Sequence, residues 1–172
     1  QHFAECIREV RRENPNMLVE VLIPDFRGNE DLIKIIVDAR PDVLAHNIET
    51  VRRLQNIRDI RANYEQSLSV LKLAKELGIK YTKSSIMLGL GETEQEIVEA
   101  MQDLRAIGVD IITFGQYLRP SNKHIQITEY VHPDKFECYK KIAEELGFLY
   151  CASGPFVRSS YRAGEFFLKG LK

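Results

Sequence analysis

The chain has 172 residues, with 24 basic and 25 acidic side chains, a net charge of −1 and 44% hydrophobic residues. This composition favours one soluble globular domain with a substantial core. The balanced charge gives no reason to expect a nucleic-acid partner. No apolar run approaches the roughly 20 residues that span a bilayer, so no membrane partner is expected either. The sequence starts inside a helical pattern without an initiator methionine, which indicates a fragment of a longer protein.

The three cysteines, Cys6, Cys138 and Cys151, have no C-x-x-C spacing. Their odd number and wide separation argue against a disulfide framework and favour a reducing compartment. We expect all three to be small buried hydrophobic side chains. The sequence contains no self-sufficient cysteine metal site.

Helix and strand patterns alternate along the chain. Apolar residues at helical spacing predict a first helix over residues 3–10, and later helices begin after Asn29, at Tyr64, after Thr93 and after His132. The strands are predicted at residues 17–24, 43–45, 79–88, 109–115 and 148–153. The first of them is rich in branched residues and is expected to be buried on both faces. Five strands alternating with helices predict an α/β fold with a parallel sheet and right-handed crossovers.

Polar residues follow every predicted strand. The carboxyl ends of parallel strands meet at one edge of a sheet, where the active sites of α/β proteins form, so we expect a ligand site there. Each position alone is weak support, because loops are polar and helix N-termini favour such residues in any case. The residues are Asp25, Asn47, Glu49, Gly89, Gly91, Glu92, Gln116, Arg119, Ser153, Arg158, Ser159 and Ser160.

Two of these groups have features of a ligand site. Asn47 and Glu49 lie two residues apart in an extended segment, so their side chains share one side and match the vicinal hydroxyls of a ribose. Residues 89–92 (GLGE) permit close backbone approach and lead into a helix N-terminus that favours anions. Ordinary turns explain both groups equally well. His46 has no second ligand at metal-binding spacing and is expected to be packed or to support the site.

The stretch at residues 153–164 (SGPFVRSSYRAG) brings two arginines, two adjacent serines and a tyrosine to the end of the last strand. Gly154 and Pro155 predict a turn that would carry these groups back to the sheet edge as part of a site. The alternative is the start of a C-terminal helix, with Ser159 or Ser160 as its N-cap.

Four stretches resemble lipoyl synthase, a family of radical S-adenosylmethionine enzymes, in the family's order and across essentially the whole chain. Its Arg-Ser-Ser-Tyr signature is highly specific, whereas Gly-Leu-Gly-Glu is typical of the wider superfamily. The resemblance implies a partial (β/α) TIM-type barrel with outer helices that lacks its N-terminal strands. Residues 1–153 would form the barrel part, and residues 154–172 would carry the signature and close the site. The stretches are 19–26 (VEVLIPDF), 45–50 (AHNIET), 87–92 (MLGLGE) and 153–161 (SGPFVRSSY).

The family's chemistry inserts two sulfur atoms into an octanoyl chain carried by a lipoyl-carrier domain. One [4Fe-4S] cluster cleaves S-adenosylmethionine reductively to a 5'-deoxyadenosyl radical, and a second [4Fe-4S] cluster donates the sulfur. The implied partners are an electron donor and the carriers, namely the E2 subunits of 2-oxoacid dehydrogenases and the H protein of glycine cleavage. The implied location is the mitochondrion in a eukaryote and the cytoplasm in a bacterium.

The resemblance also assigns site residues. Ser160 would be the serine ligand of the auxiliary cluster, while Arg158, Ser159 and Tyr161 would contact substrate or close the site. The S-adenosylmethionine contacts would be Asn47 and Glu49 at the ribose or methionine part, Gly89, Gly91 and Glu92 at the adenosyl side, Arg61 at the carboxylate, and Gln116 and Arg119 close to cofactor or substrate.

The chain departs from the family pattern in one respect. Two cysteine triads precede the matched region in the family, and neither occurs here. We therefore expect this chain alone to lack sulfur-insertion activity. Two alternatives stay open. One is an aldolase-like barrel with Lys83 as a Schiff-base lysine. The other is a non-catalytic, partner-dependent fragment with open sheet edges.

Overall fold

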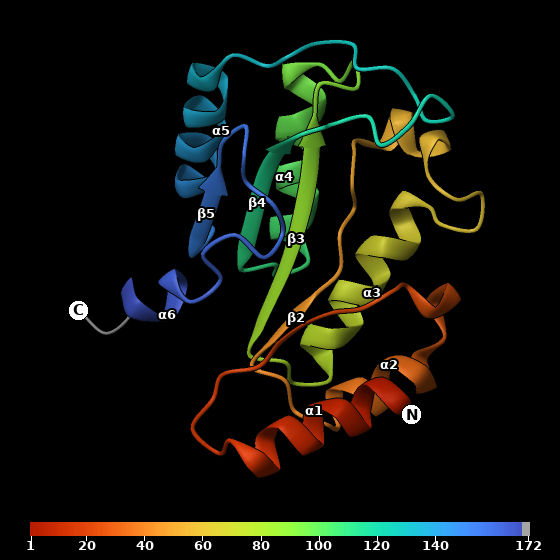
Figure 1. The fold of residues 1–172 in the computed structure, drawn as a ribbon, viewed down its shortest axis with the longest axis vertical. Coiled ribbons are helices and arrows are strands. Elements are labelled where there is room, and N and C mark those ends of the chain that lie inside the picture. Colours follow the sequence, from red (N-terminus) through yellow and green to blue (C-terminus); the bar gives the residue numbers. More distant parts are fainter. Residues whose placement is uncertain (170–172) are drawn as a thin grey trace.

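The computed structural model describes residues 1–169. A single parallel sheet with strand order β1-β2-β3-β4-β5 organises this part of the chain (Figure 1). The predicted α/β fold and the number of strands are therefore confirmed. The strands are β1 (Glu20–Leu22), β2 (Val43–Ala45), β3 (Tyr81–Leu88), β4 (Ile111–Gln116) and β5 (Tyr150–Ser153).

Local sequence signals define most of the helix boundaries. The Thr93 hydroxyl accepts from the Glu96 N–H while the Glu96 carboxylate accepts from the Thr93 N–H, a capping box that starts the fourth helix after Thr93 as predicted. Asn29 and Asn63 cap the second and third helices in a similar way. The helices are α1 (His2–Glu13), α2 (Glu30–Val37), α3 (Tyr64–Glu76), α4 (Glu94–Ala106), α5 (Pro133–Glu145) and α6 (Glu165–Lys169), with 3-10 helices η1 (Phe26–Gly28) and η2 (Arg52–Ile57).

The two faces of the sheet pack against different parts of the chain. On the outer face, alternate strand residues such as Leu44, Ile86 and Phe114 join the main core with the apolar sides of α1 to α5. On the inner face, Val43 and Ile111 belong to a smaller cluster, and Phe166 and Phe167 of α6 pack against it. Helices α1 to α5 therefore lie on the outer face of the sheet, as in a segment of a (β/α) barrel, while α6 lies against the inner face.

The C-terminal segment crosses the inner face of the sheet. It leaves β5 at the carboxyl edge and runs in front of β4 and β5 toward α6 (Figure 1). Val157 is buried on the way, and its carbonyl oxygen lies so close to Gly115 that a Cβ on that residue would approach it within less than 3.0 Å. Glycine at position 115 thus permits the crossing.

The structure corrects three expectations. β1 is shorter than predicted and is not buried on both faces, because it pairs only with β2 among the described strands and leaves Leu22 54% exposed. Cys6 and Cys138 are exposed, since each lies on the solvent side of its helix, and only Cys151 is buried. Neither Ser159 nor Ser160 caps a helix, because turns continue to the start of α6. No helix within residues 1–169 is long and apolar enough to cross a membrane.

Candidate functional site

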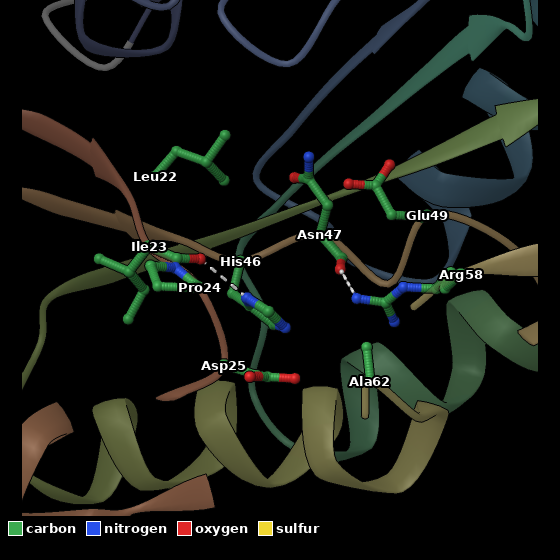
Figure 2. A pocket seen from close by; sticks show the side chains of 9 residues that line it. All are labelled: Leu22, Ile23, Pro24, Asp25, His46, Asn47, Glu49, Arg58 and Ala62. Carbon is green, nitrogen blue, oxygen red and sulfur yellow. Dashed lines mark hydrogen bonds between the residues drawn. The ribbon is translucent and has the colours of Figure 1, made fainter. Parts of the chain in front are cut away.

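A cavity of about 380 Å³ opens at the carboxyl ends of β1 and β2 (Figure 2). Residues directly after the two strands form its walls, since Ile23 continues the ladder by donating its N–H to the Ala45 carbonyl over 2.9 Å. The segment after η2 closes the far side. The lining residues are Leu22, Ile23, Pro24, Asp25, His46, Asn47, Glu49, Arg58 and Ala62.

Asn47 and Glu49 lie together in this cavity, as predicted, and their side chains extend in the same direction (Figure 2). The Asn47 Oδ1 atom is buried and has no hydrogen-bond partner among the described residues. Glu49 adopts a φ of 65°, a left-handed conformation that a residue with a Cβ rarely adopts. Hydrogen bonds to Ser85 and Met87 of β3 hold it there. An unpaired amide oxygen beside a carboxylate on a strained backbone is typical of a ligand site.

Arg58 supplies the positive charge of the cavity. Its Nη1 donates to Ser67 Oγ at 3.1 Å and to Gln55 Oε1 at 2.8 Å, and its Nη2 donates to the Asn47 carbonyl at 3.4 Å. Partial burial lowers the pKa of Arg58, although the Glu49 and Asp25 carboxylates oppose this effect. Within residues 1–169, the hydrogen-bond partners of the Arg58 guanidinium are two neutral side chains and two backbone carbonyls, and none is a carboxylate. The guanidinium is therefore anchored by neutral groups and can pair with an anionic ligand.

The Gly-Leu-Gly-Glu turn follows β3, next to the β2 end. Gly89 and Gly91 both have positive φ values, 99° and 98°. The Glu92 carboxylate accepts from the backbone N–H groups of Gly89 and Leu90 at 2.5 and 2.8 Å. The turn is thus fixed from inside, and Glu92 shapes it.

Arg53 connects this turn to the segment that follows the cavity. Its Nη2 donates to the Gly91 carbonyl at 2.8 Å, and its guanidinium pairs with both oxygens of Glu96 at 2.6 and 2.9 Å. The hydrogen bond from Arg53, together with the Thr93 backbone, lowers the pKa of Glu96 to about 2. The link therefore stays charged at physiological pH.

Three of the predicted ligand residues bond within the protein. Arg61 lies outside the cavity in a two-point ion pair with Asp59, at 2.7 and 2.6 Å. Gln116 is buried, with Nε2 donating to three backbone carbonyls and Oε1 accepting from the Val131 N–H. Arg119 donates to carbonyls of its own loop. Arg58 lines the cavity and Arg61 does not, and Arg58 is not among the residues predicted from the sequence.

The signature segment lies away from the cavity, on the inner face of the sheet. Arg158 donates to the Gln116 carbonyl at 3.2 Å, which fixes the segment to the end of β4. Ser159 is half-buried and Ser160 is exposed. Tyr161 lines a separate cavity of about 280 Å³ beside β5.

The residues that the structure describes do not supply the full ligand set of an iron-sulfur cluster by themselves. They contain no group of three or more His, Cys, Asp or Glu side chains that would hold a metal ion. Burial raises the pKa of the Cys151 thiol to about 12, which disfavours the thiolate that iron requires. Asn47, Glu49 and Arg58, by contrast, present an amide, a carboxylate and a guanidinium to one cavity. The structure defines an α/β protein whose sheet is a segment of a (β/α) barrel, with a small-molecule cavity at its carboxyl edge.

Comparison with known proteins gives the family. The model of the radical SAM superfamily matches residues 1–104, so the chain belongs to this superfamily. It is 58% identical over 172 residues to a lipoyl synthase of Halobacterium salinarum, which confirms the resemblance seen in the sequence. It is 57% identical over 172 residues to a mitochondrial lipoyl synthase of Trichoplax adhaerens. These alignments cover 99% of this chain and 55% and 49% of the relatives, so the chain spans about half of their length.

The fold is also found among solved structures. The chain superposes on the crystal structure of methylornithine synthase with a TM-score of 0.68. The superposition covers 98% of this chain and 62% of the methylornithine synthase chain. Because the two sequences are only 10% identical, this similarity concerns the fold alone. It agrees with the partial barrel described above.

Proposed function

We propose that this chain supplies the S-adenosylmethionine-binding part of a lipoyl synthase, an enzyme that inserts two sulfur atoms into a protein-bound octanoyl chain. The observation that carries the proposal is the cavity with its unpaired Asn47 Oδ1, its Glu49 carboxylate and its unpaired Arg58. The high identity of the whole chain to proteins named lipoyl synthase supports it.

The cavity groups complement the parts of S-adenosylmethionine. Arg58 pairs with the carboxylate of the methionine part, in place of Arg61. Glu49 and Asn47 bind the ammonium group or the ribose hydroxyls. Asp25 adds a second carboxylate to the cavity lining, which would favour a cationic ligand. When bound, this cofactor supplies the carbon radical of the family's reaction.

The turn after β3 binds the adenosyl side. Gly89 and Gly91 give the turn its shape, because both adopt positive φ values and Gly89 packs directly against the Glu129 carbonyl and the Gln116 amide. Glu92 keeps the turn rigid through its two backbone hydrogen bonds. Gln116 acts behind the turn by fixing residues 129–131, and Arg119 fixes its own loop on the substrate side.

The C-terminal segment closes the inner face over the substrate. Its anchors are the buried Val157 and the Arg158 hydrogen bond to the end of β4. Ser160 would be a ligand of the auxiliary cluster, with Ser159 and Tyr161 toward the substrate. The remaining ligands of two [4Fe-4S] clusters would come from the cysteine triads that precede this region in the family. The partners are an electron donor and octanoylated carrier domains, in a mitochondrion or a cytoplasm.

The aldolase-like alternative has little support in the geometry. Lys83 is 2% exposed and its Nζ lies 2.7 Å from Glu20 Oε1. The Glu20 carboxylate therefore occupies the amine, and no substrate carbonyl can reach it while this ion pair is formed. Lys83 also does not line the cavity.

A chimera tests the proposed function. This chain would replace the matching region of the Halobacterium salinarum lipoyl synthase, and mass spectrometry would follow the octanoylated carrier for a gain of two sulfurs and a loss of two hydrogens. We expect activity in the chimera, retention with Ser69→Ala on the exposed side of α3, and loss with Ser160→Ala. A folded chimera that binds both clusters and S-adenosylmethionine yet forms no product would contradict the proposal.

A further inference from the structure

The buried ring of His46 connects three elements around the cavity. It lies directly after β2 and is 4% exposed. Its Nδ1 is 2.9 Å from the Ile23 carbonyl oxygen after β1, a contact that Figure 2 shows, and its Nε2 is 3.0 Å from Ser67 Oγ on α3. These contacts define which ring nitrogen carries the hydrogen.

A carbonyl oxygen only accepts hydrogen bonds, so Nδ1 must carry the hydrogen that it donates to Ile23. Burial lowers the pKa of His46, and the bond to Ile23 opposes this effect. In the resulting neutral ring, Nε2 is an acceptor. The Ser67 hydroxyl must therefore donate to His46, and its lone pairs are left for another donor.

That donor is Arg58. Its Nη1 lies 3.1 Å from Ser67 Oγ, and the other contacts of Nη1 are the Gln55 side chain and the Ile48 carbonyl. The direction of donation runs from Arg58 to Ser67 and from Ser67 to His46. A charged His46 would donate at both nitrogens, so the Ser67 hydrogen would turn away from the ring and compete with Arg58 for space.

We propose that His46 is a positioning residue: as the neutral ring with hydrogen on Nδ1, it orients Ser67 and thereby holds Arg58 toward the ligand's carboxylate. The inference rests on the proposed role of Arg58. It extends that role to two residues that do not have to touch the ligand.

Two amide substitutions at position 46 separate the two ring contacts. A glutamine carboxamide reaches the place of Nε2 and can still accept from Ser67, whereas an asparagine carboxamide reaches only the place of Nδ1. In calorimetric titrations with S-adenosylmethionine, His46→Gln should bind within about twofold of the natural chain. His46→Asn should bind about tenfold more weakly, the effect of losing one hydrogen bond that positions a charge. Equal affinities of the two variants would overturn the proposal.

Serine substitutions on α3 give a matched pair. Ser67→Ala should weaken binding about tenfold, because it removes the bridge between His46 and Arg58. Ser69→Ala is the control, since Ser69 is exposed and donates only to the Glu65 carbonyl. Unchanged affinity in folded Ser67→Ala would also overturn the proposal.

Nuclear magnetic resonance tests the positioning without the ligand. Long-range ¹H–¹⁵N spectra should show the hydrogen of His46 on Nδ1, and the Arg58 guanidinium should rotate slowly in the natural chain and in His46→Gln but freely in His46→Asn. A hydrogen on Nε2, or free rotation of Arg58 in the natural chain, would contradict the inference. If the natural chain does not bind S-adenosylmethionine, the proposed function fails, and these spectra still decide the role of His46.

Discussion

Replacement of Gly89 by alanine should destabilise the fold through a steric clash that can be separated from backbone strain. Gly89 and Gly78 share a φ of 99°, so alanine meets the same unfavourable conformation at both positions. A Cβ at Gly89 would lie less than 3.0 Å from the Glu129 carbonyl oxygen and from Nε2 of Gln116, whereas nothing lies within 4 Å at Gly78. The difference between the two variants therefore measures the clash.

The two costs can be estimated. The left-handed conformation costs alanine about 1–2 kcal/mol, offset in part by about 0.4–1 kcal/mol from the reduced entropy of the unfolded chain. Gly78→Ala should thus lower the free energy of unfolding by about 1 kcal/mol. Crowding against a fixed backbone carbonyl and a fully bonded amide adds about 1–3 kcal/mol, so Gly89→Ala should lose about 2–4 kcal/mol in total.

Urea unfolding of the two variants and the natural chain provides the measurement. Gly89→Ala should also weaken binding of S-adenosylmethionine, because the clash displaces the turn after β3. Equal unfolding free energies for the two variants would refute the steric argument. Such a result would show that residues 129–131 can shift at no cost to make room for the added methyl group.

Three further outcomes are expected. Arg53→Gln should weaken S-adenosylmethionine binding several-fold by releasing the Gly-Leu-Gly-Glu turn, whereas Arg52→Gln should not, because Arg52 contacts α3 and α4 instead of the turn; equal effects in the titration would contradict this. The depressed pKa of His46 means that the unfolded chain binds a proton that the folded chain does not, so stability should be complete above about pH 6.5 and fall as the pH drops below it. His46→Gln should remove this part of the urea-midpoint shift between pH 7.5 and 5.5, and an unchanged shift would count against it. Lys83→Ala leaves the Glu20 carboxylate unpaired on the inner face and should lower the free energy of unfolding in urea by about 2–4 kcal/mol. Lys72→Ala removes an exposed ion pair with Glu76 and should lower it by only about 0–1 kcal/mol. Similar losses in the two variants would show that the Lys83 pair is not buried in solution.

Sequence patterns predicted the elements well where a local signal sets a boundary. The capping box at Thr93 and Glu96 and the glycines after the helices mark their ends through local geometry. The extent of β1 was not predictable, because burial of its second face depends on neighbouring segments and not on its own residues. The exposed Cys6 and Cys138 were misjudged for the same reason.

The candidate site was predicted in part. Asn47 and Glu49 follow the strand directly, so the parallel sheet alone brings them to the carboxyl edge. Arg58 was missed because residues 51–61 lack a regular period, and only the three-dimensional path of η2 shows which arginine enters the cavity. Asp59, two residues before Arg61, was a local signal that Arg61 has a partner.

A comparison of variants at Arg58 and Arg61 tests most directly which of the two arginines binds S-adenosylmethionine. S-adenosylmethionine would be titrated into the natural chain, Arg58→Met and Arg61→Met by isothermal calorimetry, after thermal melting has shown that all three are folded. The account predicts binding by the natural chain, about the same affinity in Arg61→Met, and a loss of at least about tenfold in Arg58→Met. Unchanged binding in Arg58→Met, or no binding by the natural chain, would contradict the assignment of the cavity to S-adenosylmethionine.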